Sequence, residues 1–154
     1  ALSQRKTGSL AGALTLRREF EDILEDIHTR IEKQLEAEFD EEKKHLKQTT
    51  DVSGQWLESR EKEMLAAVQA RYLQERDALM ELLLAWMGDV LRHKAGADRL
   101  DLPDYAAATR ALADRWDAAG ISRCLTELRK LNSNLHTNVN EPLALDTAFV
   151  AAFG

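Results

Sequence analysis

The chain has 154 residues, of which 44% are hydrophobic and 31% charged, with only 7 glycines and 2 prolines. This length fits one domain with a real core, and this composition suits a soluble, mostly helical protein. The net charge of −6 argues against broad nucleic-acid binding by the whole chain, although it leaves room for a local basic patch. The single cysteine, Cys124, excludes an internal disulfide framework. We expect a cytoplasmic protein, because the sequence contains no signal peptide or membrane span.

Residues 1–9 are predicted to form a flexible polar segment before the domain, and residues 10–47 are expected to form the first helix. Because the chain begins at Ala1 and not at a methionine, we expect a fragment of a longer protein. The apolar residues of the helix recur every three or four positions and form one stripe opposite a charged face. This stripe consists of Leu16, Phe20, Ile23, Ile27, Ile31, Leu35, Phe39 and Leu46.

A second helix is predicted over residues 55–94, after a stretch of turn and capping residues at 49–54. From Leu79 onward its apolar face widens, which indicates that this half is buried in a domain core. Before Leu79 the apolar stripe is narrow, so a single partner helix is enough to cover it. The stripe consists of Leu57, Met64, Val68, Tyr72, Leu79, Leu83, Trp86 and Val90.

Two long helices joined by a short turn predict an antiparallel hairpin. Forty helical residues reach about 60 Å, roughly twice the width of a globular domain of this size. We therefore expect residues 35–68 to project as a two-helix arm from a single domain over residues 10–154. Trp56 lies near the expected tip of this arm and is a candidate contact for a partner protein.

The rest of the chain predicts three shorter helices. Gly96 is a plausible C-cap for the second helix, and Pro103 fits the first turn of a third helix that ends near Ala118, before Gly120. A fourth helix is expected over residues 121–136. Pro142 then opens the last helix, so that the chain forms an all-α bundle of about five helices. The third helix has its own stripe, formed by Tyr105, Ala108, Leu112 and Trp116.

The joint between the last two helices contains an Asn-Val-Asn sequence. Asn138 can adopt a left-handed conformation at the helix end, and Asn140 can cap the last helix. We expect Val139 to point inward and to fix the angle between the two helices.

Two Glu-x-x-His pairs, Glu25 with His28 and Glu42 with His45, have the spacing found in carboxylate di-iron sites. Both pairs lie on one predicted helix, roughly 25 Å apart, and so cannot share a metal. We interpret them as solvated surface residues and expect no metal site.

The remaining candidates also favour structural roles. His93 and Lys94 complement the dipole at the end of the second helix, with a DNA-facing or nucleotide-facing role as the weaker alternative. Cys124 is expected to be a buried or interface thiol, and Trp86 and Trp116 are expected to be core residues. The sequence thus predicts no catalytic, cofactor-binding or metal-ligating residue, and we expect a protein without enzymatic activity.

Three stretches in the second half of the chain share one recognisable pattern. Residues 78–97 combine an apolar-aromatic run with an aspartate and a basic ending before glycine. Leu112 and Ala113 lie in the stretch LADRW. Residues 125–146 run from a leucine-rich helix with a basic pair, through the Asn-Val-Asn joint, into a Leu-Ala-Leu-acid helix. Together they resemble the C-terminal collar domain of bacterial clamp-loader subunits, most of all the delta-prime subunit of DNA polymerase III.

The resemblance implies a domain that joins a ring of loader subunits, which holds ATPase-like domains around primer-template DNA while a sliding clamp is loaded. The ATPase-like domain of the parent protein would lie upstream. The connection over residues 35–68 is shorter in that family, so the resemblance implies that the arm is an insertion. The partners would be other clamp-loader subunits, with DNA contacted only through the parent complex and with no small-molecule substrate, cofactor or membrane involved.

Under this resemblance, residues of the last two helices and their joint are the expected subunit interface or packing residues. Whether each belongs to the core or to the interface stays open at this point. The set consists of Leu125, Leu128, Leu131, Leu135, Asn138, Val139, Asn140, Leu143 and Phe149.

The leading hypothesis is therefore a non-catalytic oligomerisation domain of a clamp-loader subunit. The alternative is a free-standing helical-hairpin adaptor that binds partner proteins through its arm. An all-helical metalloenzyme is the least favoured hypothesis.

Overall fold

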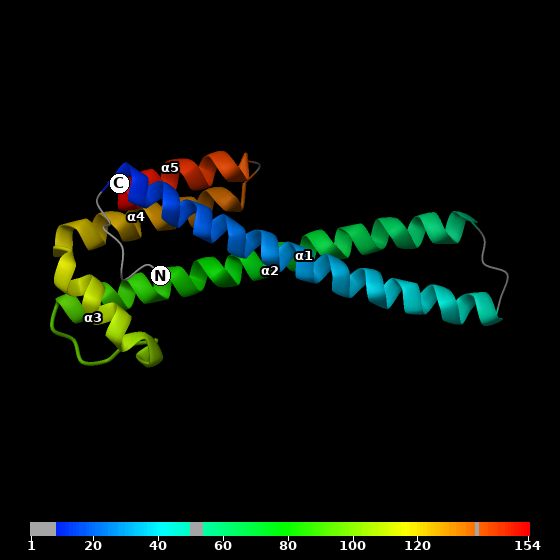
Figure 1. Ribbon diagram of the computed structural model, residues 1–154, viewed down its shortest axis with the longest axis horizontal. Helices are drawn as coiled ribbons and strands as arrows, with labels where there is room; N and C mark the ends of the chain where they lie inside the picture. The colour runs from blue at the N-terminus through cyan, green and yellow to red at the C-terminus, as the bar shows by residue number, and fades with distance from the viewer. Residues whose placement is uncertain (1–8, 50–53, 138) are drawn as a thin grey trace. The chain divides into compact units, whose positions relative to one another are not determined.

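The structure, a computed structural model, describes residues 9–49, 54–137 and 139–154, with only the backbone given for residues 46–49. The described residues form helices and no strand, which confirms the all-α class, and none of these helices is long and apolar enough to cross a membrane. Figure 1 shows the elements, which are α1 (Leu10–Thr49), α2 (Gly54–Lys94), the 3₁₀-helix η1 (Pro103–Tyr105), α3 (Ala106–Arg115), α4 (Ala118–Leu135) and α5 (Glu141–Phe153).

The chain divides into two compact units. The bundle unit consists of Ala1–Phe20 and Ala78–Gly154, and the hairpin unit consists of Glu21–Asp77. Both α1 and α2 contribute residues to each unit. The predicted arm, residues 35–68, lies within the hairpin unit, and its status as an insertion stays a prediction.

Within the hairpin unit, α1 and α2 run antiparallel, as predicted. The rings of His28 and Tyr72 meet edge to face at 5.3 Å between centroids. Farther along α1, Glu42 Oε2 lies 2.6 Å from Arg60 Nη2. Residue numbers thus rise on one helix while they fall on the other, which fixes the antiparallel register of the pair.

The hairpin unit buries a narrow seam, and the predicted stripe of α1 is wrong at Ile23. Ile23 is 45% exposed, whereas its neighbour Leu24 is only 3% exposed. Steps of three and of four residues both continue a helical stripe from Phe20, and the structure uses the step of four. The buried apolar residues of this unit are Leu24, Ile31, Phe39 and Val68.

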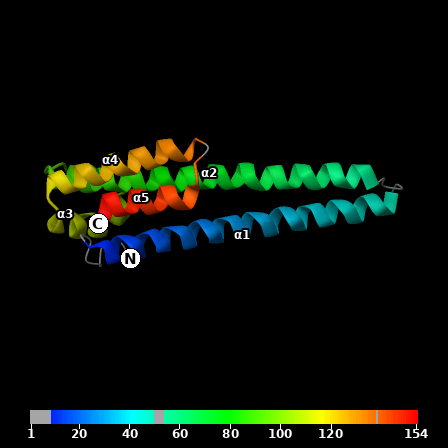
Figure 2. The ribbon, with the colours of Figure 1, turned by 90° about the horizontal axis from the view of Figure 1, so that it is seen from above.

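In the bundle unit, α4 and α5 pack side by side and antiparallel (Figures 1 and 2). The C-terminal half of α2 contributes the wide apolar face that the sequence predicts, although Leu82 on that half is exposed. The buried residues of α2 here are Met80, Leu83, Trp86, Met87, Asp89 and Val90.

Four aromatic side chains form a continuous run through the bundle unit. Phe20 of α1 lies 5.3 Å from Phe149 of α5, between ring centroids, and Phe149 lies 5.5 Å from Phe153. Phe153 in turn lies 5.9 Å from Trp116, at the corner between α3 and α4. Tilted aromatic pairs at these separations are favourable beyond the area that they bury, so this run joins three parts of the unit.

The boundary between α3 and α4 differs from the prediction. Gly120 does not end the third helix but lies in the first turn of α4, whose N-cap is Asp117. The Asp117 carboxylate accepts a hydrogen bond from the Gly120 N–H at 2.7 Å, and Trp116 is already extended. An aspartate N-cap satisfies a free N–H at the start of a helix, which explains why the break comes earlier than the glycine. Tyr105, predicted in the stripe of the third helix, belongs to η1 and is 54% exposed.

α2 ends at Lys94, and Gly96 caps it, as predicted. This glycine has φ of +81°, a conformation in which a residue with a Cβ is strained. Its N–H donates to the His93 carbonyl at 3.0 Å, and the Ala97 N–H donates to the Arg92 carbonyl at 2.9 Å. This pair of bonds is the Schellman motif, which satisfies carbonyls that the helix leaves unpaired.

Two leucines that differ in burial provide a matched test of the bundle core. Leu128 is fully buried, whereas Leu143 is 63% exposed. We predict that Leu128→Ala lowers the free energy of unfolding by about 2–5 kcal/mol, because it leaves a cavity. Leu143→Ala should change it by less than about 0.5 kcal/mol, as is usual for a surface substitution. Urea denaturation followed by circular dichroism measures both, and equal effects of the two changes would contradict this placement.

Candidate functional site

The predicted interface residues divide into a buried and an exposed group. The buried side chains line the inner faces of α4 and α5, so they stabilise the bundle unit itself. This group consists of Leu125, Leu128, Leu131, Leu135 and Phe149. Any contact that they make with a neighbouring subunit stays a prediction, and the exposed group is better placed to carry one.

Val139 and Leu143 are the exposed apolar members of the set, at 40% and 63% exposure, and Asn140 is exposed as well. The expectation that Val139 points inward is therefore wrong. The chain turns between α4 and α5 through backbone bonds, in which the Thr137 N–H donates to the Asn134 carbonyl and the Val139 N–H donates to the Thr137 carbonyl, both at 2.9 Å. Because these bonds close the turn, the angle between the helices does not need an inward valine.

Asn140 caps α5, as predicted. Its side-chain oxygen accepts a hydrogen bond from the Leu143 N–H at 3.0 Å, and Pro142 occupies the first turn, where a missing N–H costs nothing. Asn138 lies outside the described residues. The cap fixes where α5 starts and leaves an apolar edge at the surface. We call Val139, Pro142 and Leu143, all exposed, the joint edge.

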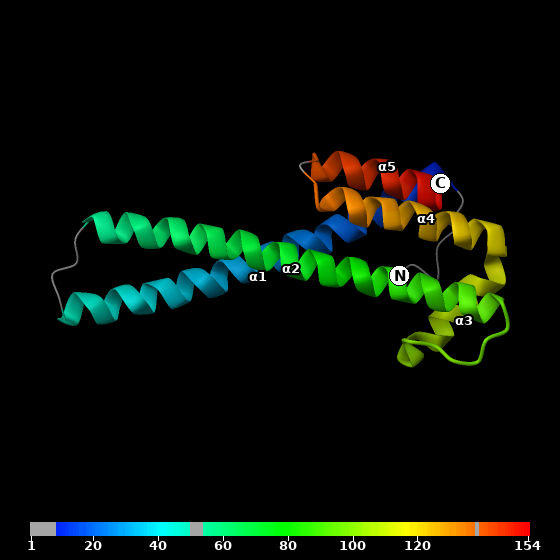
Figure 3. The same cartoon turned by 180° about the vertical axis from the view of Figure 1, so that it is seen from behind.

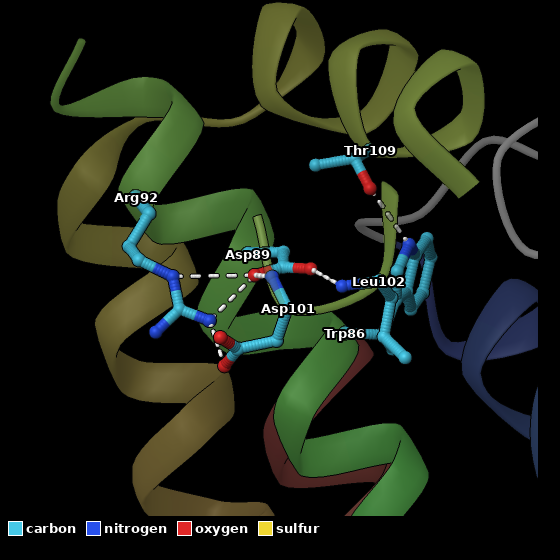
Figure 4. A network of polar contacts seen from close by, with 6 residues as sticks. All are labelled: Trp86, Asp89, Arg92, Asp101, Leu102 and Thr109. Carbon is cyan, nitrogen blue, oxygen red and sulfur yellow. Dashed lines mark hydrogen bonds and ion pairs between the residues drawn. The ribbon is translucent and has the colours of Figure 1, made fainter. Parts of the chain in front are cut away.

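The buried carboxylate of Asp89 is the centre of a network of polar contacts in the bundle unit (Figure 4). It accepts hydrogen bonds from the backbone N–H groups of Asp101 at 2.9 Å and of Leu102 at 2.8 Å. The Arg92 guanidinium also donates to it, with Nη2 at 2.5 Å, and pairs with the Asp101 carboxylate as well. Asp89 thus holds the end of the loop that leads from α2 to η1.

The electrostatics of Asp89 agree with this geometry. Burial by itself would raise the pKa of its carboxyl group. The Asp101 N–H, the Arg92 guanidinium and the Leu102 N–H together outweigh burial and hold that pKa below the ordinary value of 3.8. Asp89 is therefore a fixed negative charge at neutral pH, and it has no role as a proton donor there.

Two further contacts hold α3 against the end of α2. Figure 3 shows the ribbons of these two helices from behind. Trp86 Nε1 donates to Thr109 Oγ1 at 3.1 Å, and both residues are buried. Lys94 Nζ donates to the Ala113 carbonyl at 2.9 Å. Lys94, at the basic end of α2, thus links α2 to α3 within the bundle unit. The neighbouring His93 is half-buried.

The sequence reasoning missed the role of Asp89. One signal for it is the position of an aspartate within the wide apolar face of α2, three residues before Arg92. An acidic residue on a buried face must find donors, since an isolated buried charge is costly. The backbone donors come from a loop, and their identity cannot be read from helical periodicity.

The candidates in the hairpin unit lie in structural contacts. His28 packs against Tyr72, and Glu42 accepts from Arg60. The described residues contain no group of three histidine, cysteine or carboxylate side chains that could hold a metal ion. Trp56 lies half-buried in the first turns of α2, and its proposed contact with a partner stays a prediction.

Cys124 lies fully buried on α4. Burial raises the pKa of its thiol to about 12, because the low-dielectric surroundings disfavour the thiolate. The thiolate is the reactive form of cysteine, so this residue behaves as a small apolar core group.

We predict that Asp89→Asn lowers the free energy of unfolding by about 2 kcal/mol near neutral pH, because hydrogen bonds to a charged group contribute about 1.5–3 kcal/mol. The exposed Asp114→Asn is the matched control and should change little. Since the folded-state pKa of Asp89 is depressed, its contribution is complete above the ordinary value of 3.8 and is lost as the pH falls through the lower folded-state pKa. Urea titrations from about pH 7 to about pH 3 should show the two proteins converging only at the acid end. A difference that grows on acidification would contradict this account.

Cys124 should resist thiol reagents in the native protein. We expect labelling by a maleimide or a disulfide reagent at neutral pH to be slow and to accelerate in urea in parallel with unfolding, since reaction requires exposure and ionisation. Mass spectrometry of timed samples measures this rate. Rapid labelling without urea would place the thiol at the surface.

The chain matches a known protein family over most of its length. Residues 38–149 match the family described as "DNA polymerase III, delta subunit, C terminal". The matched range begins within the segment predicted as an arm and includes α2, α3 and α4 entire. Neither the curated proteins nor the solved structures yield a match.

Proposed function

We propose that this chain, which belongs to the family of C-terminal domains of the DNA polymerase III delta subunit, is a non-catalytic assembly domain of a clamp-loader subunit. It would bind other loader subunits through a collar and so support the loading of sliding clamps during DNA replication. Membership of the family supports a subunit of this complex. The collar role and the choice of partner surface are our inferences.

The observation that carries the assembly role is the joint edge. Leu143 is the most exposed large apolar residue of the chain among those described, and Val139 and Pro142 lie beside it in sequence. Burying one such leucine in a protein contact is worth about 1.5–3 kcal/mol, the range expected of a hot-spot residue. The adjoining cap at Asn140 fixes the edge, so little conformational entropy is lost when a partner binds.

The pattern of residues 125–146 supports the finer proposal that the parent protein is a delta-prime subunit, although the matched family is described by the delta subunit. In that role the parent protein would work in the cytoplasm and would contact DNA only through the assembled complex. The alternative, a free-standing hairpin adaptor, predicts no ATPase-like sequence upstream of Ala1 in the parent gene. Sequencing that region separates the two.

We predict that Leu143→Glu abolishes co-assembly with the other clamp-loader subunits while the chain stays folded. A charge at the centre of an apolar contact costs both the lost burial and the desolvation of the carboxylate. Size-exclusion chromatography of the parent protein mixed with the other subunits measures assembly, and circular dichroism checks folding.

Leu82→Glu provides the matched control, since Leu82 is an exposed leucine on α2 in the same unit. This variant should assemble like the unmodified protein. Normal assembly of Leu143→Glu would show that the joint edge is not the subunit contact.

A further inference from the structure

The longest uncharged stretch of the hairpin unit lies on α2. Residues 64–70 of α2, with the sequence MLAAVQA, carry no charged side chain. Val68 faces the seam and is buried, whereas Leu65 is 60% exposed. The neighbouring alanines, Ala66, Ala67 and Ala70, are exposed as well. Two turns of α2 thus present an uncharged surface with one large apolar side chain at its edge.

The register of the hairpin identifies what lies across from this stretch. His28 contacts Tyr72, Arg30 Nη2 lies 3.8 Å from Glu75 Oε2, and Glu42 pairs with Arg60. These pairs place residues 64–70 opposite about residues 32–38 of α1, because an antiparallel pair of helices keeps the sum of the paired numbers nearly constant. That part of α1 contains three glutamates, Glu32, Glu36 and Glu38, and a single lysine.

The charge of the whole hairpin unit has the same sign. Residues 21–77 contain 16 acidic and 9 basic residues, a net charge of −7, which exceeds the −6 of the full chain. Two hairpins of this charge repel each other, so a second copy of the chain is a poor partner for this surface. A helix with basic flanks is complementary to it.

We propose that residues 64–70 of α2 are a docking surface for an amphipathic helix of another protein, one that has leucine-like residues on one face and lysine or arginine at its edges. The apolar face would cover Leu65. The alanines allow a helix backbone to approach closely, as small residues do at helix–helix contacts. The basic edges would lie over the glutamates of α1. This inference is independent of the proposed collar role, which concerns the bundle unit.

The test uses the full chain and two synthetic helical peptides with the same leucine face, one flanked by lysines and one by glutamates. Fluorescence anisotropy measures the binding of each labelled peptide. We expect the lysine peptide to bind and the glutamate peptide not to bind. Leu65→Gln should weaken binding of the lysine peptide by about tenfold, the loss expected when a leucine is no longer buried.

Ile23→Gln is the matched control, since Ile23 is an exposed aliphatic residue of the same unit on α1. This change should leave binding unaltered. No weakening by Leu65→Gln would show that the peptide binds through charge alone. Equal weakening by both substitutions would show that residues 64–70 do not define the binding site. Either result would overturn the proposal. Tight binding of the glutamate peptide would overturn it too. So would dimerisation of the chain by itself that Leu65→Gln abolishes, because the occupant would then be a second copy.

Discussion

The path of the chain after α2 depends on one buried carboxylate. Asp89 is inaccessible to solvent and accepts from two successive backbone N–H groups, those of Asp101 and Leu102. A loop that crosses the end of a helix has no regular partners for its backbone, and each unpaired buried group is costly. With the Schellman motif at Gly96 at one end of the loop and Asp89 at the other, this cost is avoided. The start of η1 is thereby fixed, and α3 follows where Thr109 can accept from Trp86.

The position of α3 in turn constrains the remaining bundle. Trp116 closes α3 and contacts Phe153, which belongs to the aromatic run that reaches Phe20 of α1 through Phe149. This run and the leucines of α4 use most of the large apolar side chains of the last two helices. Among the described residues, the large apolar side chains that stay exposed there are at the turn and in the first turn of α5. The joint edge is a candidate assembly surface for this reason: it is the apolar part of α4 and α5 that intramolecular packing does not use.

The sequence predicts the helices well and the contacts between side chains less well. The two long helices follow from periodicity, and Gly96 and Asn140 follow from capping chemistry, because these features depend on residues close in sequence. Ile23 and Leu24 both continue the stripe, and only packing against a partner decides between them. Gly120 could end the third helix and Asp117 could start the fourth, and residue types alone do not decide between these two signals. In the structure Asp117 starts α4 and Gly120 lies in its first turn. The prediction that Val139 points inward is wrong, because hydrogen bonds of the backbone close this turn and the valine side chain is exposed. The partners of Asp89 are backbone N–H groups of a loop twelve and thirteen residues away in sequence, so they can be identified only once the path of the loop is known.

The hairpin unit has few buried side chains to stabilise it. Its buried apolar seam is narrow, and many of its ion pairs are exposed, such as Lys44 with Glu41 at 2.7 Å. Exposed pairs of this kind stabilise a helix only weakly, and isolated helices are limited by the cost of nucleation and not of propagation. Both α1 and α2 also contribute residues to the bundle unit, where more apolar side chains are buried, and helical structure stabilised there favours propagation of each helix into the hairpin. A chain stabilised in this way can keep its hairpin surface highly charged and still leave one uncharged stretch, residues 64–70, that its own fold does not require to be covered.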